Sequence, residues 1–178
     1  MPKRTAGKKP PQAVNAKSSR RDQSLRKHLL ALLDSSEAHL NFSDAVAAFA
    51  PVQRGIRPPG AAHTAWQLLE HLRICQWDIL EFSRNPTHAS LSWPEGYWPA
   101  TDAPTSEEAW DQSIAAFRAD LRAMRKLIAD PRRDLFARVH HPEAEAKHTL
   151  LREALLLADH NAYHIGQLVL LRRVLGAL

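Results

Sequence analysis

Two histidines stand four residues apart in an apolar stretch near the C-terminus, LLLADHNAYHIGQLVLLRRVLG. They are His160 and His164, and the leucines around them follow the three-and-four spacing of one helix face. Residues i and i+4 of a helix have Cβ atoms about 5–6 Å apart, so both imidazoles can reach one ion at about 2.0–2.1 Å. The spacing predicts either a pair of polar core residues or two ligands of one metal ion.

A third histidine, His71, stands on the apolar face of another expected helix, WQLLEHLRICQWDILEF. Alone, such a residue is more often a hydrogen-bonded core histidine than a ligand. One cation satisfies three inward-facing imidazoles together and keeps at least one coordination position for water or substrate. We therefore predict His71, His160 and His164 as metal ligands. Asn161 replaces the glutamate of an HExxH motif, which argues against a metalloprotease.

Four neighbouring side chains carry secondary hypotheses. Glu153, two helical turns before the histidine pair, is either a catalytic acid–base group or, as the favoured interpretation, a simple solvated or arginine-paired carboxylate. Asp159 and Tyr163 either orient an imidazole or are a surface aspartate and a half-buried tyrosine without a role in the site. Cys75, one turn after the third histidine, is a fourth ligand, a reactive thiol or, as the favoured interpretation, a small buried hydrophobe. Glu153 and Tyr163 are thus the two catalytic candidates.

Helices are expected to position these residues along almost the whole chain. The expected helical regions are 24–49 with a break near 34–36, 64–84, 105–129 and 149–175. Thr64 and Thr149 are suitable N-caps, and Thr105 begins a run typical of a capping box. Residues 132–148 are expected to be irregular, with room for one short strand.

A long connection rich in proline and aromatic residues, NPTHASLSWPEGYWPATDAP, follows the second long helix. A strict up-down-up-down bundle needs only short loops, whereas this length lets the second and third helices run parallel. We predict an all-α four-helix bundle with a long crossover connection between helices two and three. Trp93, Tyr97 and Trp98 of this loop either close over the open metal position and select an apolar or aromatic substrate, or pack on the bundle ends or a dimer partner.

The positive charge of the chain is concentrated at its N-terminus. The 178 residues suffice for one domain with a sizeable core and carry a net charge of +5. Seven basic residues and no acidic one fall within residues 1–21, so the remainder has a net charge of −2. We expect residues 1–22 to be a disordered basic tail and residues 23–178 to form the bundle. Because the tail interleaves no aromatic residues for base stacking, a solubilising extension is favoured over nucleic-acid contact.

The cellular compartment is predicted from what the sequence lacks. A single cysteine excludes an internal disulfide, and no segment has the apolar core of a secretory signal. No stretch approaches the roughly 18 consecutive apolar residues of a membrane span. We expect a cytoplasmic protein without a membrane partner.

The segments at 159–176, DHNAYHIGQLVLLRRVLG, and at 66–82 resemble the DinB/YfiT-like metalloproteins, and a looser resemblance runs from about Gln23 to the end. It implies a bundle with a long crossover and a metal ion held by three histidines, which fall on His71, His160 and His164. It also implies a homodimer, zinc or nickel as the ion and, as in some relatives, chemistry with a low-molecular-weight thiol.

These observations predict a metal-dependent enzyme of the thiol-transferase or hydrolase type. The ion would lower the pKa of a bound thiol or water, which would then attack a small electrophilic substrate. The alternative is a non-enzymatic bundle that binds a metal or ligand and acts through a partner. The nearly neutral bundle domain argues against nucleic-acid binding.

Overall fold

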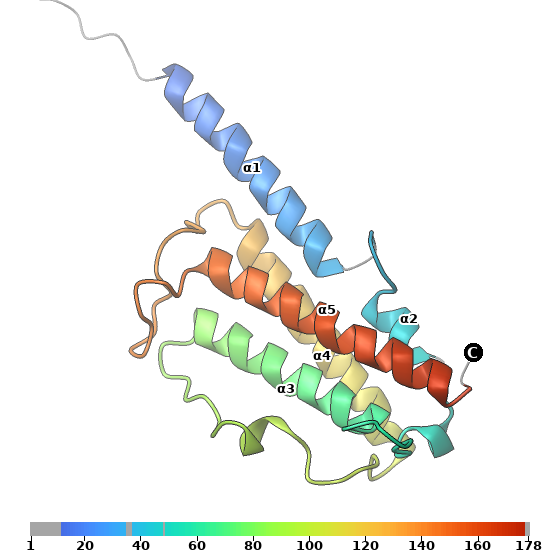
Figure 1. The fold of residues 1–178 in the computed structure, drawn as a ribbon. Coiled ribbons are helices and arrows are strands. Elements are labelled where there is room, and N and C mark those ends of the chain that lie inside the picture. Colours follow the sequence, from blue (N-terminus) through green and yellow to red (C-terminus); the bar gives the residue numbers. More distant parts are fainter. Residues whose placement is uncertain (1–11, 35–36, 48, 177–178) are drawn as a thin grey trace, which may run out of the picture.

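The protein is a bundle of four long helices, shown by a computed structural model that describes residues 12–34, 37–47 and 49–176 (Figure 1). Its α-helices are α1 (Gln12–Asp34), α2 (Phe42–Ala47), α3 (Ala65–Arg84), α4 (Glu107–Ala129) and α5 (Leu150–Val174). Two single 3-10 turns are η1 (Pro51–Gln53) and η2 (Glu95–Tyr97). The described residues form no β-strand, so the all-α prediction is confirmed.

The direction of the helices shows the predicted crossover. In Figure 1, α1 and α5 run one way along the bundle, and α3 and α4 run the opposite way. The connection between α3 and α4 returns along the length of the bundle, so these two helices are parallel neighbours. α3 and α1 each pack against both α4 and α5, and α2 packs against α5.

Side-chain caps define where two of these helices begin. Thr64 accepts a hydrogen bond from the Gln67 backbone N–H, and the Gln67 side chain accepts one from the Thr64 backbone N–H, which forms a complete capping box for α3. Thr149 accepts from the Arg152 backbone N–H at the start of α5. After α5, Gly176 has a φ of +67°, the left-handed conformation that glycine adopts without a steric penalty. These boundaries agree with the sequence prediction.

Three expectations need correction. The N-cap of α4 is Ser106, one residue later than Thr105, and it accepts from the Ala109 backbone N–H. α1 begins at Gln12, so residues 12–22 are helical where a tail was expected, because this run has no glycine or proline and is rich in good helix formers. Residues 1–11 of that tail lie outside the described residues. The expected short strand in 132–148 is a single isolated bridge to Thr149.

The core consists of two apolar clusters separated by a polar layer. On α3, the buried apolar residues of the first cluster end at Leu72, and the second cluster contributes Leu80. On antiparallel α5, the second cluster ends at Ala158, and the first begins at Ile165. Three buried polar side chains, Gln76 on α3 and Asn161 and His164 on α5, fall in these two gaps and meet at one level of the bundle. Among the described residues, no helix is both long and apolar enough to cross a bilayer.

Candidate metal centre

Three side chains of types that can ligate a metal ion converge where α3 faces α5. His71 and Cys75 are one turn apart on α3 and nearly inaccessible to solvent, and the half-buried His160 faces them from α5. Their ligand atoms all lie within 4.8 Å of one another. His71 Nε2 is 3.2 Å from His160 Nε2, and Cys75 Sγ is 3.5 and 3.6 Å from the two ring nitrogens of His71. Two helices therefore contribute imidazole and thiol donors to one point.

His164, the third predicted ligand, lies beside this cluster. Its ring centroid is 4.6 Å from those of both His71 and His160. Its Nδ1 is 2.8 Å from the side-chain oxygen of Gln167, one turn further along α5. The group whose ligand atoms all lie within 4.8 Å of one another contains Cys75 in its place. The structure thus brings all three predicted histidines into ring contact, and it adds a cysteine that the sequence interpretation favoured as a plain hydrophobe.

The histidines are neutral at physiological pH because they are buried. Burial is the main cause that lowers the pKa of His71 and of His160 to about 4, and it also lowers the pKa of His164. His71 Nδ1 is 2.8 Å from the carbonyl oxygen of Tyr97. A carbonyl only accepts, so the proton of this neutral ring is on Nδ1. The lone pair of His71 Nε2 therefore points toward His160, the form in which imidazole binds a metal.

A chain of buried amides reaches the cluster from the opposite side. The Gln76 amide donates to the backbone oxygen of Phe117 at 2.6 Å, and the Asn161 amide donates to the Gln76 side-chain oxygen at 3.1 Å. Because the chain ends on a carbonyl, the orientation of both amides is fixed. It leaves Asn161 Oδ1 buried without a donor, next in sequence to His160, whose buried Nδ1 also has no partner.

These orphaned atoms fit a cation between the two rings. If the proton of His160 were on Nε2 and donated to His71, then His160 Nδ1 would be an acceptor. It would lie beside Asn161 Oδ1, which is also an acceptor, and neither atom would have a donor. If the proton is on His160 Nδ1 instead, Asn161 gains a donor, and this hydrogen bond opposes the effect of burial on the His160 pKa. The two Nε2 lone pairs then face each other and need a positive charge between them. Two ligands of one tetrahedral zinc ion lie about 3.3 Å apart, close to the 3.2 Å observed.

The crossover loop covers one side of the centre. Trp98 stacks on His71 with a centroid distance of 3.8 Å and an interplanar angle of 2°, and His63 stacks on Trp98 at 3.8 Å and 13°. Two rings cannot share one face of the indole at this distance, so the imidazoles occupy opposite faces. Tyr97 is buried, whereas Trp93 is 70% exposed. Of the two predicted roles for this loop, the contacts of Trp98 match closure over the histidines.

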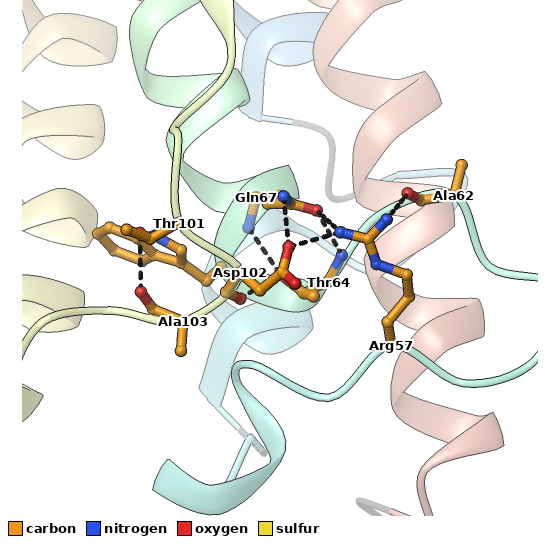
Figure 2. A network of polar contacts seen from close by, with 8 residues as sticks. Arg57, Ala62, Thr64, Gln67, Thr101, Asp102 and Ala103 are labelled. Carbon is orange, nitrogen blue, oxygen red and sulfur yellow. Dashed lines mark hydrogen bonds and ion pairs between the residues drawn. The ribbon is translucent and has the colours of Figure 1, made fainter.

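A polar network at the start of α3 holds this loop in place (Figure 2). Thr64 Oγ1 donates to the backbone oxygen of Asp102 at 2.6 Å, and the Asp102 carboxylate accepts from Gln67 and Arg57. The Trp66 indole N–H donates to the Thr101 hydroxyl at 3.1 Å. The contacts join the segment before α3 to the end of the crossover loop. They therefore fix the two chain segments that carry His63 and Trp98.

The two catalytic candidates lie in different surroundings. Glu153 is 2% exposed and pairs with Arg152 at 3.0 Å, and it is not part of the clustered group. Tyr163 is 64% exposed, with its ring 4.8 Å from that of His164. Of these two candidates, Tyr163 is the one that contacts a predicted ligand. Asp159, the other residue considered for orienting an imidazole, is exposed.

Sequence reasoning missed several parts of the site. Asn161 was considered only as the lost glutamate of a protease motif, although its place beside a candidate ligand was a usable signal. Gln76 was an available signal too, as an amide on the apolar face of its helix. His63 offered none, because its contact with Trp98 depends on the paths of two loops.

The family model described as the DinB superfamily matches residues 34–168. The chain belongs to the DinB superfamily. The matched range contains all three predicted histidine ligands and Cys75, and it confirms the family resemblance seen in the two histidine segments. No curated protein and no solved structure gave a significant match to the chain. Membership in the DinB superfamily therefore establishes the family and the fold, and the reaction has to be argued from the site.

Proposed function

We propose that this DinB-superfamily protein is a metal-dependent enzyme that activates a thiol or a water molecule for attack on a small electrophilic substrate. The observation that carries the proposal is the 3.2 Å approach of His71 Nε2 to His160 Nε2, with His164 and Cys75 beside them. His71, His160 and His164 would hold the ion, with zinc or nickel suited to imidazole donors. When bound, a divalent ion acts as a Lewis acid that lowers the pKa of a thiol or water at its open position.

The chain's own residues orient the donors and control access. The Tyr97 carbonyl oxygen and the Gln167 side-chain oxygen accept the Nδ1 protons of His71 and His164, so each ring presents Nε2. Trp98 excludes water from one face of His71. Tyr163 is the better placed of the two catalytic candidates, since Glu153 is held by Arg152. A low-molecular-weight thiol cofactor, a cytoplasmic location and a homodimer complete the proposal.

One observation favours the alternative, a non-enzymatic bundle that keeps its ion and acts through a partner. His71 is only 2% exposed and lies beneath Trp98, as in a closed structural site. The two functions differ in one measurable property. An enzyme needs a coordination position that exchanges with small ligands, and a structural site does not.

Cobalt(II) substitution tests this property. Purified protein is loaded with Co²⁺, and its absorption spectrum is recorded before and after addition of ethanethiol. The proposal predicts a new thiolate-to-cobalt band in the wild type and in Cys75→Ser, and loss of bound cobalt in His164→Ala. His39→Ala, which changes an exposed histidine, is the control and should behave as the wild type. A cobalt spectrum that does not respond to thiol would contradict the enzyme and support the structural site.

A further inference from the structure

A cavity of about 430 Å³ lies next to the metal centre, between the loop before α3 and the C-terminal half of α5. Its walls are residues 58–63, Leu68, Gln167, Leu170, Leu171 and Val174. Except for His63 and Gln167, these side chains are apolar or absent. The volume falls in the range of small-molecule pockets, about 300–1,000 Å³.

Of the two polar residues of the wall, Gln167 contacts a candidate ligand directly, and His63 is linked to another through Trp98. Gln167 accepts the hydrogen bond of His164 Nδ1. His63 stacks on Trp98, whose other face covers His71. Leu68, a wall residue, precedes His71 by one turn of α3. The polar edge of the cavity therefore borders the candidate ligands, and its apolar remainder extends away from them toward the end of α5.

The apolar part has a closed floor and an open mouth. Leu68 and Leu171 are buried and form the floor, while Leu170 and Val174 are 62% and 59% exposed. Exposed leucine and valine beside a concave apolar surface gain free energy when a hydrocarbon covers them.

We propose that this cavity binds the hydrocarbon part of the substrate, an aliphatic chain or ring attached to a reacting head group at the metal centre. This inference rests on the proposed function, because it places the head group at the open coordination position. It names the substrate class as amphipathic: a polar head for the histidine cluster and a hydrocarbon tail for residues 58–63 and the end of α5.

A series of straight-chain alkanethiols tests the inference on the cobalt-loaded full-length protein. Ethanethiol, butanethiol, hexanethiol and octanethiol are titrated, and the thiolate-to-cobalt band gives each dissociation constant. We expect binding to tighten about fourfold per added methylene, the factor that corresponds to about 0.8 kcal/mol, until the cavity is filled. Leu170→Trp and Ala62→Trp each place an indole at the cavity and should flatten this dependence.

Leu155→Trp is the matched control, since it changes another exposed leucine of α5 that does not line the cavity, and it should keep the wild-type chain-length dependence. Equal affinity for all four thiols in the wild type would overturn the inference and leave the proposed function standing. A chain-length dependence that both tryptophan variants retain would also overturn it, because the hydrocarbon would then lie elsewhere. If none of the four thiols changed the cobalt spectrum, the proposed function would be overturned and this inference with it.

Discussion

The buried amides of Gln76 and Asn161 have one orientation only, because their hydrogen bonds end on the backbone oxygen of Phe117. The free oxygen of Asn161 therefore calls for a donor, and His160 Nδ1–H is the buried group beside it that lacks a partner. In this account Asn161 positions His160 by selecting the tautomer that presents Nε2. Loss of such a partner of a ligating histidine weakens metal binding about 10–100-fold.

We predict this loss for Asn161→Leu, measured as the zinc dissociation constant in competition with a chromophoric chelator. Ser83→Ala is the control, since it removes another buried side-chain hydrogen bond of the bundle, to the Ile79 backbone oxygen, without touching the site. Circular dichroism shows whether both variants fold. Equal zinc affinity of the two folded variants would rule out the positioning role.

The buried imidazoles also make stability depend on pH. The pKa of His71 and of His160 is about 4 in the folded protein and about 6.5 in an unfolded chain. Between these values the unfolded state binds more protons, so the stability of the metal-free protein falls as pH drops from about 6.5 to about 4. A shift of this size corresponds to on the order of 3 kcal/mol for one ring.

Urea unfolding of the metal-free protein at several pH values measures this dependence. The wild type should lose stability steadily below about pH 6.5. The double variant His71→Gln, His160→Gln should lose much less over the same window, because glutamine does not titrate. Parallel curves for the two proteins would show that other groups cause the acid sensitivity.

The spacing of residues in the sequence was sufficient to predict that the histidines lie together. It was not sufficient to predict the side chains that contact them. A separation of four residues on an apolar helix face puts His160 and His164 side by side in any straight helix. His71 followed from its position among the leucines of a second such face. The contribution of Asn161 depends on a neighbour from another helix, Gln76, and the cover over His71 depends on the path of a loop. Neither of these contacts produces a periodic pattern in the sequence.

Thr64 shows how one helix start also holds the crossover loop. It caps α3 by accepting from Gln67, and its hydroxyl donates to the backbone of Asp102 across the loop. Thr149 caps α5 in the same way, and its hydroxyl has no such contact with the crossover loop. The two threonines therefore form a matched pair.

We predict that Thr149→Ala costs about 1 kcal/mol of unfolding free energy, as for a lost N-cap, and that Thr64→Ala costs about 1 kcal/mol more, because Asp102 loses a buried donor. Urea titration measures both. Tryptophan fluorescence should change only in Thr64→Ala, since Trp98 lies in the loop that Thr64 holds. Equal costs with unchanged fluorescence in both variants would contradict the link between cap and loop.

The helices were predictable wherever capping residues and apolar period agreed. α3 and α5 begin at the predicted threonines because the side-chain oxygen of each accepts a backbone N–H of the first turn. At α4, Thr105 and Ser106 are equally good caps by type, and only the structure selects Ser106. α1 begins at Gln12, well before the first leucine of its apolar period, because residues 12–22 favour helix by propensity.

For the molecule as a whole, Arg26 ties α1 to the end of α4. This guanidinium is 6% exposed and donates to the backbone oxygens of Ile128, Asp130 and Arg133 at 2.5, 3.0 and 2.6 Å. A helix C-terminus leaves carbonyl groups without partners, and a cation there satisfies them and the helix dipole. Arg125 also joins these helices, through an ion pair with Asp34 in which both side chains are partly exposed.

The two arginines should therefore differ in their effect on global unfolding. We predict that Arg26→Met lowers the unfolding free energy by about 2–4 kcal/mol, because buried carbonyls lose their donors. Arg125→Met should lower it by less than about 1 kcal/mol, as for an exposed ion pair. Urea unfolding followed by circular dichroism gives both values. A cost for Arg26→Met as small as that for Arg125→Met would contradict the anchoring role of Arg26.

The overall topology was predictable because one connection was too long for a simple up-and-down bundle. Parallel α3 and α4 followed from the length of the segment between them, and this arrangement carries Trp98 back to His71. The cavity beside the centre was not predictable, because residues 58–63 and the end of α5 meet only in the folded chain.

Metal content of the untagged, purified protein tests the central claim most directly, beside His71→Ala, His160→Ala and the control His39→Ala. The account predicts about one zinc or nickel ion per chain in the wild type and in His39→Ala, and loss of the ion in both other variants. A wild type that holds no metal after incubation with zinc and with nickel would contradict it. So would a folded His71→Ala or His160→Ala variant that keeps one ion per chain.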